Sequence, residues 1–397
     1  MESLLINLED TPLKLKSTSL LIAGALLGSA MLPAQASNEA MTDLLKVLYQ
    51  KGTISSTDYE LLVNAANADK EANEAVAMKA DKASKSDASW ANRIKIKGDM
   101  RFRHETENND IAGQETNDED RFRIRARVGM YADVNDNVKA GVRFVTTSGS
   151  ATSTNQSLEN NFASTSVGLD LGYITWTPEM LGGNTSMTFG KMKKPWQQVN
   201  NIIWDGDTNP DGAVIVSNID MGSFTLAPSA GYYTLGSNGN DSISDDAHVN
   251  HAQLAAKMGK SKFGISYYGF ENTAEEERLF ELFGQTPIPG TPVTVFASHV
   301  SNSNADAVGD DDNAWGIGLK AKLADFKLSY EYLDLGINAV NDSFDNSDFV
   351  SDSKGSIVKA GYKIDKNFSV GATYYTSESN INDDEADLLH LDLKVKF

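Results

Sequence analysis

The sequence predicts an all-β fold, a transmembrane antiparallel β-barrel of about fourteen strands that follows a small N-terminal α-helical segment. Three observations predict it. From Arg93 to Phe397, apolar and polar side chains alternate in short segments, as they do when the two faces of a strand meet different surroundings. Long and short connections alternate between these segments. After residue 37 no apolar run is long enough for a membrane-spanning helix, so a closed barrel is the structure with which this region would cross a bilayer.

Composition excludes several classes of protein. The 397 residues include no cysteine, which excludes a disulfide framework and a thiolate metal site. The net charge of −20 argues against a general nucleic-acid binder, so nucleic acid is not expected as a partner.

The first 36 residues have the pattern of a secretory signal peptide. Lys14 and Lys16 precede an apolar run at 20–27, and the small residues of Ala-Gln-Ala at 34–36 offer a cleavage site before Ser37. The acidic residues among the first ten are atypical, and a start site placed too early would explain them. Export together with the lack of cysteine indicates the envelope of a Gram-negative bacterium.

Residues 37–90 predict a helical prefix on the periplasmic side. TDLLKVLYQKG (42–52) is a short amphipathic helix closed by Gly52, and Thr57 with Glu60 has capping-box spacing for a second helix. Residues 64–89 are rich in Ala, Lys, Asp and Glu, which is typical of a solvated helix or linker. A short coiled coil that trimerises a stalk is the alternative, but no sustained heptad of Leu or Ile supports it.

The region 91–397 is predicted to form the barrel, and fourteen of its segments have the two-residue period of strands. In RIKIKGDMRFRHE (93–105), Ile94, Ile96 and Phe102 share one face, and lysines and arginines take the other. The remaining segments are 120–131, 137–147, 167–177, 184–192, 212–219, 222–235, 248–258, 261–270, 313–323, 325–333, 355–364, 367–377 and 387–397. A further segment, TPVTVFASH (291–299), raises the count to sixteen if it belongs to a hairpin.

The connections fit a barrel that crosses the outer membrane. Long joints fall at 106–118, 148–165, 192–210, 236–247, 272–312, 337–353 and 378–385, with a short turn between each pair. Short periplasmic turns and long outer loops are the topology of such barrels, and an even strand number leaves both ends of the barrel on the periplasmic side.

A soluble β-sandwich is the alternative fold. It would also show alternating strands, but it gives no reason for loop lengths to alternate so regularly. Tyrosine and tryptophan also lie near strand ends, as expected for the aromatic girdles of a membrane barrel. These residues are Tyr173, Trp176, Tyr267, Tyr268, Tyr374 and Tyr375.

The order of these parts resembles the family of putative bacterial porins. The signal peptide, the helical segment with LLKVLYQKGTIS, the first strand IKIKGDMRFRHE and the terminal Phe397 carry the resemblance, which spans nearly the whole mature chain. The terminal strand ending in Phe397 also resembles the recognition signal of the barrel-assembly machinery. The family implies passive diffusion of small solutes and says little about which ones.

Arginine is concentrated in the first three strands. Eight of nine arginines lie between Arg93 and Arg143. On the lipid face each would cost about 2–4 kcal/mol at the membrane midplane, so we expect them to line the lumen. The set, called the arginine ladder below, is Arg101, Arg103, Arg121, Arg123, Arg125, Arg127 and Arg143.

Because like charges opposite each other destabilise a sheet, something acidic should face the ladder. The candidate is the third long loop, 192–210, continuing into the next strand, with Asp205, Asp207 and Asp211 close to Trp204. If this loop folds inward, its carboxylates would narrow the lumen and create a transverse field. In the alternative, the loop lies outside and the arginines pair with Asp99, Glu105 and Asp170.

The sequence contains no sign of catalysis, and no cofactor or metal is expected. The histidines are His104, His248, His251, His299 and His390, and none lies in a nucleophile or zinc signature. The loop around Asp205 has alternating oxygen ligands, but Pro210 occupies the glycine position that a calcium loop requires.

The sequence therefore predicts an outer-membrane porin that selects small polar or charged solutes by width and field. Its expected partners are membrane lipid and lipopolysaccharide, the assembly machinery and the solutes, and monomer and homotrimer both stay open. The alternative is a non-conducting barrel that acts as an adhesin or structural envelope protein, for which the long joint 272–312 would supply the binding surface.

Overall fold

The structure is a computed structural model that describes residues 35–65, 67–68, 71, 91–110, 117–159, 161–236, 246–273, 276–304, 311–346, 348–349 and 352–397. The chain divides into two units, Met1–Ser89 and Trp90–Phe397. The predicted signal peptide and most of the predicted linker lie outside the described residues.

The first unit holds a helical hairpin. Helix α1 (Gln35–Gln50) ends before Gly52, whose φ of 71° needs the left-handed conformation that glycine adopts easily. A second helix covers 56–65. Its cap differs from the predicted one, because the amide of Asp58 donates to Oγ of Ser55 at 3.1 Å and that hydroxyl donates to Asp58 at 2.6 Å. Ser55 and Asp58 thus hold the capping positions that Thr57 and Glu60 were predicted to hold.

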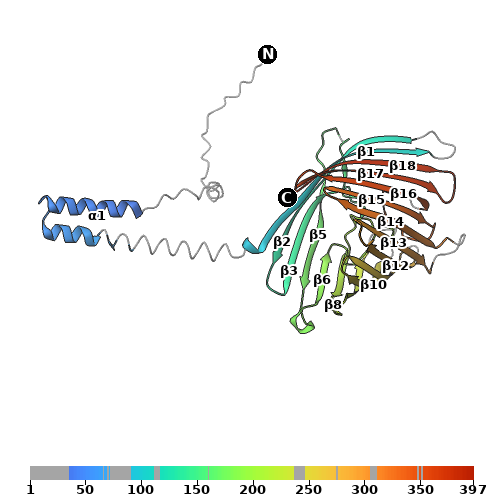
Figure 1. Cartoon of the computed structure of the whole chain (residues 1–397), viewed down its shortest axis with the longest axis horizontal. Coiled ribbons are helices and arrows are strands. Elements are labelled where there is room, and N and C mark those ends of the chain that lie inside the picture. The colour runs from blue at the N-terminus through green and yellow to red at the C-terminus, as the bar shows by residue number, and fades with distance from the viewer. Residues whose placement is uncertain are drawn as a thin grey trace, which may run out of the picture. The chain divides into compact units, whose positions relative to one another are not determined.

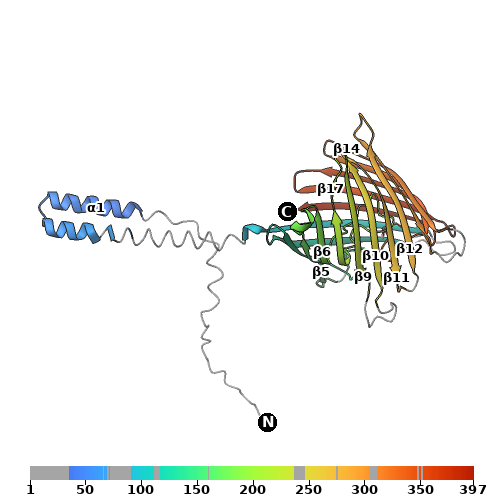
Figure 2. The same cartoon turned by 90° about the horizontal axis from the view of Figure 1, so that it is seen from below.

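The second unit is a β-barrel preceded by the short 3-10 helix η2 (Ala91–Arg93). Figures 1 and 2 show its strands from two directions. The strands are β1 (Ile94–Asp110), β2 (Asn117–Asp133), β3 (Val138–Thr146), β4 (Gln156–Ser157), β5 (Val167–Trp176), β6 (Thr185–Lys191), β7 (Asp211–Ser217), β8 (Ile219–Asp220), β9 (Thr225–Thr234), β10 (His248–Met258), β11 (Ser261–Glu271), β12 (Glu277–Pro287), β13 (Val293–Asn302), β14 (Asn313–Leu323), β15 (Phe326–Leu335), β16 (Ser353–Lys363), β17 (Phe368–Ser379) and β18 (Glu385–Lys396). The 3-10 helix η3 (Glu179–Leu181) lies between β5 and β6.

The barrel is closed and has sixteen strands. β7 and β8 both pair with β9 and make one interrupted strand, and β4 is a two-residue piece paired with β2. Each remaining strand pairs antiparallel with its neighbours, and β18 closes the sheet against β1. All fourteen predicted segments are strands, and TPVTVFASH belongs to β13, which pairs with β12. The sixteen-strand reading of the sequence is therefore the one that holds.

The joint 272–312 is not the long loop that the sequence predicts. It contains β12 and β13, and the connection between β11 and β12 is only 272–276. Four of the predicted long joints are long connections, at 147–166, 192–210, 235–247 and 336–352, whereas those predicted at 106–118 and 378–385 shorten to 111–116 and 380–384, because the strands on either side are longer than predicted. Most of the segment that the adhesin alternative needed as a binding loop is therefore part of the barrel wall.

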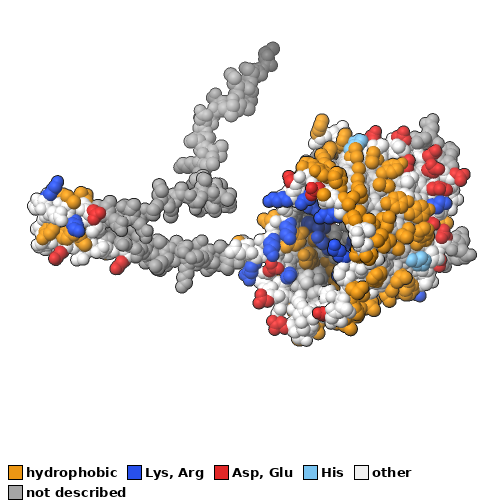
Figure 3. Space-filling model, viewed as in Figure 1, with side chains coloured by type: hydrophobic (Ala, Val, Ile, Leu, Met, Phe, Trp, Pro, Cys, Tyr) orange, Lys and Arg blue, Asp and Glu red, His pale blue; other side chains and the backbone are white. Residues whose placement is uncertain are grey.

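The barrel places polar side chains inside and apolar side chains outside. On β18, Leu391 and Leu393 are 47% and 45% exposed, whereas His390 and Asp392 are 0% and 4% exposed. Figure 3 shows hydrophobic side chains spread over the outer wall. This is the reverse of a water-soluble sandwich, and it is the arrangement that lipid around a barrel requires.

Three of the six aromatic residues predicted for the outer girdles point into the barrel. Trp176 and Tyr374 are exposed on the outer face, but Tyr268 and Tyr375 are buried inside the barrel and Tyr173 packs against the same interior cluster. Adjacent tyrosines on one strand point to opposite faces, so in Tyr267-Tyr268 and Tyr374-Tyr375 one ring of each pair must point inward.

The end of the chain completes the wall. Phe397 donates its amide to the carbonyl of Gly98 at 3.0 Å and accepts the Gly98 amide at 2.9 Å. The Phe397 ring occupies the space that a side chain at position 98 would need. Within the described residues, no helix is long and apolar enough to span a membrane.

Candidate functional site

The arginine ladder lines the interior on β1, β2 and β3. Antiparallel pairing puts Arg101 opposite Arg125 and Arg103 opposite Arg123. Two such like-charge pairs next to each other would destabilise the sheet without counter-ions. The inward positions of the same strands and of β18 supply them.

Two carboxylates of β1 neutralise most of the ladder. Glu105 is 1% exposed and accepts hydrogen bonds from Arg121 and Arg123, the latter at 3.2 Å. Asp99 accepts from Arg125 at 3.2 Å and from Arg127 at 2.9 Å. These are pairs that the sequence offered as the alternative to an acidic inward loop.

The remaining arginines differ in their partners. Arg103 donates to both carboxylate oxygens of Asp392 on β18, at 2.8 and 3.3 Å. Arg143 pairs with Asp170, which a β-bulge between β3 and β5 brings to the inner face. Arg101 has no carboxylate within 4.0 Å among the described residues and donates to Asn155 at 2.5 Å.

Loop 192–210 also folds into the barrel. Trp196, Ile202 and Trp204 are 5%, 2% and 5% exposed and pack with the inner aromatic rings of the wall, Tyr268 lying 5.3 Å from Trp204 between ring centroids. The wall also holds the loop backbone, because Gln253 of β10 exchanges two hydrogen bonds with Gln197, at 2.8 and 2.9 Å. The loop is therefore fixed against the interior of β9 to β16.

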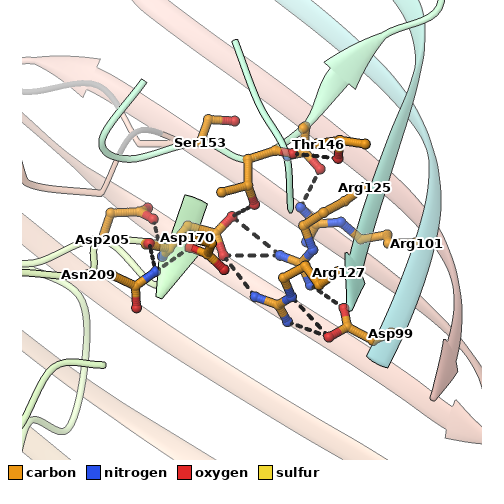
Figure 4. Close-up of polar contacts among 12 residues, drawn as sticks. Asp99, Arg101, Arg125, Arg127, Thr146, Ser153, Asp170, Asp205 and Asn209 are labelled. Atoms are coloured by element: carbon orange, nitrogen blue, oxygen red, sulfur yellow. Dashed lines mark hydrogen bonds and ion pairs between the residues drawn. The ribbon is translucent and has the colours of Figure 1, made fainter. Parts of the chain in front are cut away.

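The opposite side of this loop reaches the ladder through Asp207. Arg125 donates to both its carboxylate oxygens, at 3.0 and 3.3 Å, and Arg127 lies 3.6 Å away. Figure 4 shows these two arginines beside Asp99. Thr154 donates to Asp207 at 2.9 Å. Burial alone would raise the pKa of Asp207, but these positive charges and hydrogen bonds outweigh burial and hold the pKa below its usual value. The loop thus spans the lumen from an apolar wall to a basic wall.

The other two predicted acids lie elsewhere. Asp205 is buried behind Trp204, where its carbonyl accepts from Lys194 and its carboxylate accepts the amide of Asp207 at 2.7 Å. Asp211 is half exposed on β7 and pairs with Lys191 at 2.8 Å. Strand pairing places Lys191 and Asp211 directly opposite, which accounts for the difference from the prediction.

A second loop, 336–352, also folds inward, which its sequence does not predict. Its Phe344 lies 5.7 Å from Trp204 between ring centroids and accepts the amide of Asp205 at 2.7 Å. Its Asn341 donates to Glu277 of β12 at 2.8 Å. The run of Asn, Ser and Asp in this loop resembles ordinary surface loops, so the only sequence signal was the interspersed Phe344 and Phe349.

His390 has contacts inside the barrel that the sequence does not predict. It is fully buried, with Nε2 3.1 Å from Glu105 and 3.3 Å from Nη1 of Arg103. His104, by contrast, contacts Phe122 and lies on the face opposite to Arg103. The alternation along β18 was the available signal, because it puts His390 beside Asp392 on the inner face.

Comparisons with known proteins agree with this geometry. The profile of a family described as putative porins matches residues 111–285. OprB of Pseudomonas putida, in a high-pH structure, has a TM-score of 0.55 at 12% identity over 77% of this chain and 95% of that chain. OmpF of Salmonella typhi, in complex with daunomycin, has a TM-score of 0.52 at 10% identity over 77% of this chain and 97% of that one. At these identities the likeness is one of fold.

Comparison with curated protein sequences gives no match. The family match falls within the barrel and includes β2, much of the ladder and loop 192–210. The resemblance that the sequence predicts is therefore confirmed: residues 111–285 match the profile of the putative porins, and the fold is a closed sixteen-stranded barrel like that of the solved porins.

Proposed function

We propose that this porin lies in the outer membrane of a Gram-negative bacterium and selects polar or charged solutes where loop 192–210 faces the arginine ladder. Sixteen strands enclose a lumen too wide for wall side chains alone to fill, so a loop inside it sets the width. The mechanism is diffusion along this passage, with width and field deciding which solutes pass. A porin fold indicates a channel and not an enzyme.

One observation carries the proposal. Asp207 belongs to the loop, Arg125 and Arg127 belong to the wall, and they meet inside the barrel. Opposite charges held on facing sides of the lumen create an electric field across it, and this field orients a polar solute as it passes. Support also comes from Arg101, whose charge no nearby carboxylate among the described residues neutralises.

Planar-bilayer recording tests the role of the ladder. Arg123→Ala combined with Arg125→Ala removes two inward positive charges, so we expect the reversal potential in a salt gradient to shift toward cation preference. Arg278→Ala is the control, because Arg278 is the second residue of β12 and points outward, between Glu277 and Leu279, which point inward. An unchanged reversal potential in the double variant would contradict the proposed selectivity.

The assembly and envelope partners belong to the same proposal. Lipid and lipopolysaccharide would surround the apolar outer face, and the assembly machinery would read the terminal strand with Phe397. Monomer and homotrimer are both compatible with the closed barrel and differ in whether conductance rises in single or triple steps. A folded barrel that gives no steps would favour the adhesin alternative, although no described feature favours it.

A further inference from the structure

A group of lysines lines a cavity at the short-turn end of the barrel. The cavity, of about 740 Å³, is bounded by the turns at Asp325 and Asp365 and by the inner faces of β14 to β18. Its strand lysines are Lys320, Lys322, Lys327, Lys359, Lys363, Lys394 and Lys396. With two further lysines in turns, Lys260 and Lys366, nine lysines face three aspartates, in a chain whose net charge is −20. We call this cavity the lysine vestibule.

Side-chain positions place this charge inside the barrel. On β14 and β16 the lysines alternate with Leu319, Leu323 and Val358, which are 46%, 46% and 46% exposed on the outer face. Figure 3 shows Lys and Arg side chains gathered around the hollowed mouth on the side where Figure 1 marks the C-terminus. The charges therefore line the water-filled entrance and do not face lipid.

The vestibule differs from the ladder because, among the described residues, most of its lysines have no carboxylate within ion-pair distance, although Glu331 lies near enough to Lys320 and Lys359 to attract them. Lys322 and Lys327 stand directly opposite each other on β14 and β15. Among the described residues, only Lys394 of the vestibule lysines forms an ion pair, with Asp392 at 2.9 Å. Asp365 is used by its own turn, where it accepts the amides of Asn367 and Phe368 at 2.7 and 2.8 Å. Such repulsion costs stability unless an anion from solution relieves it.

The wall between the lysines is made of small residues. Gly361 and Gly371 stand opposite each other on β16 and β17. A Cβ at position 361 would meet no atom closer than 3.9 Å, so space for a solute lies beside the lysines. An unfilled, positively charged hollow is the form of an anion site.

The positive charge continues from the vestibule to the ladder. Strand pairing puts Lys394 opposite Arg101, the ladder arginine without a nearby carboxylate. Arg101 in turn stands opposite Arg125, which contacts Asp207 of loop 192–210. A solute that moves from the vestibule to the narrowed lumen therefore passes a continuous row of positively charged side chains.

We propose that the lysine vestibule binds small multivalent anions, solutes with two or more carboxylate or phosphate groups, and that this is the class that the porin favours. The proposal rests on the proposed channel function. Two negative groups on one solute can contact lysines from two strands at once, which a chloride ion cannot do. Binding should weaken as salt rises, because the lysines are reached through water.

The test is block of single-channel current by pyrophosphate. All channels carry Asp383→Cys in the loop 380–384 at the opposite mouth, and the chain has no other cysteine. The chamber in which a membrane-impermeant thiol reagent changes the current is the loop side. We expect pyrophosphate in the turn-side chamber to block at lower concentration than in the loop-side chamber.

Two triple variants that each remove three positive charges distinguish the effect of the vestibule lysines on block from the effect of the total charge of the protein. Lys322→Gln with Lys327→Gln and Lys363→Gln should raise the turn-side blocking concentration by about tenfold or more. The control variant combines Lys95→Gln, Lys191→Gln and Lys354→Gln, three lysines outside the vestibule that have carboxylate partners. It should leave the turn-side blocking concentration unchanged.

Each outcome decides one point. Equal block from both sides, or an equal shift in both triple variants, would overturn the vestibule proposal and leave the porin function intact. A wild-type barrel that gives no stepwise current would instead overturn the proposed function.

Discussion

Glu105 is the carboxylate that compensates the charges of Arg121, Arg123 and Arg103 in the ladder. It is almost fully buried and contacts Arg121, Arg123 and His390, with Arg103 at 3.6 Å. Removing one partner of a buried ion pair leaves the other charges without compensation. The carboxylate therefore stabilises a group of cations that could not stand next to one another without it.

Glu105→Gln should lower the free energy of unfolding by about 3 kcal/mol. Glu119→Gln removes an exposed carboxylate from the same Arg121 and should cost less than about 1 kcal/mol. Urea unfolding of the barrel refolded in detergent measures both. Equal effects would show that burial of Glu105 does not matter.

At this scale the sequence predicts which face a residue takes and offers Asp99, Glu105 and Asp170 as partners of the arginines, but it does not identify which acid of the loop reaches them. Alternation alone placed all seven ladder arginines inside. It did not distinguish Asp207 from Asp205 and Asp211, because a loop has no period and its path depends on contacts with distant strands. Asp170, which the sequence offers as a partner, pairs with Arg143 beside a β-bulge that has no sequence signature.

Among the elements, loop 192–210 combines an apolar face with buried polar groups. Burial raises the pKa of Asp205 to about 6, and the nearby Asp348 and Asp207 add to the effect. A raised carboxyl pKa means that the folded loop favours the protonated form. This contribution to loop packing is complete below the unfolded value of 3.8 and is lost as the pH rises through about 6.

We therefore expect the loop to be held more firmly at pH 4.5 than at pH 7.5. Excursions of the loop, seen as current noise, should become more frequent at the higher pH, on the order of tenfold. Asp205→Asn should remove most of this dependence, while Asp211→Asn, in an exposed pair with Lys191, should keep it. The same pH dependence in both variants would rule out Asp205 as its source.

The elements show why the strand count was hard to fix from the sequence. Segments with a clean two-residue period, such as 120–131 and 387–397, were identified directly. β12 reads ERLFELFGQTP, and its period was hidden by the acidic run before it and by the Pro-Gly turn after it. Once β13 is paired, β12 must be its partner, because a barrel leaves no strand edge open.

The whole molecule is a sheet closed by its first and last strands. Twelve consecutive residue pairs join β1 to β18, from Asp99 with Lys396 to Asp110 with Glu385. Phe397 extends this seam by one further pair with Gly98. The terminal residue is thus part of the seam that closes the barrel.

Phe397→Ala should reduce the amount of assembled barrel several-fold, since it removes the terminal aromatic and uncovers Gly98. Phe326→Ala removes another half-exposed outer aromatic, one that packs against Tyr362 at 4.7 Å between ring centroids, and should have little effect on assembly. Heat-dependent mobility on gels measures the folded fraction. A similar loss in both variants would show that Phe397 serves only as lipid-facing surface.

Because Asp205 gives its amide to the carbonyl of Phe344, two segments far apart in the sequence share a hydrogen bond in the middle of the pore. If loop 192–210 or loop 336–352 is replaced by the loop of another porin, the loop that remains loses its contact partner. Relatives that diverge in solute preference should therefore change both segments together, and grafted specificity should transfer only as a matched pair.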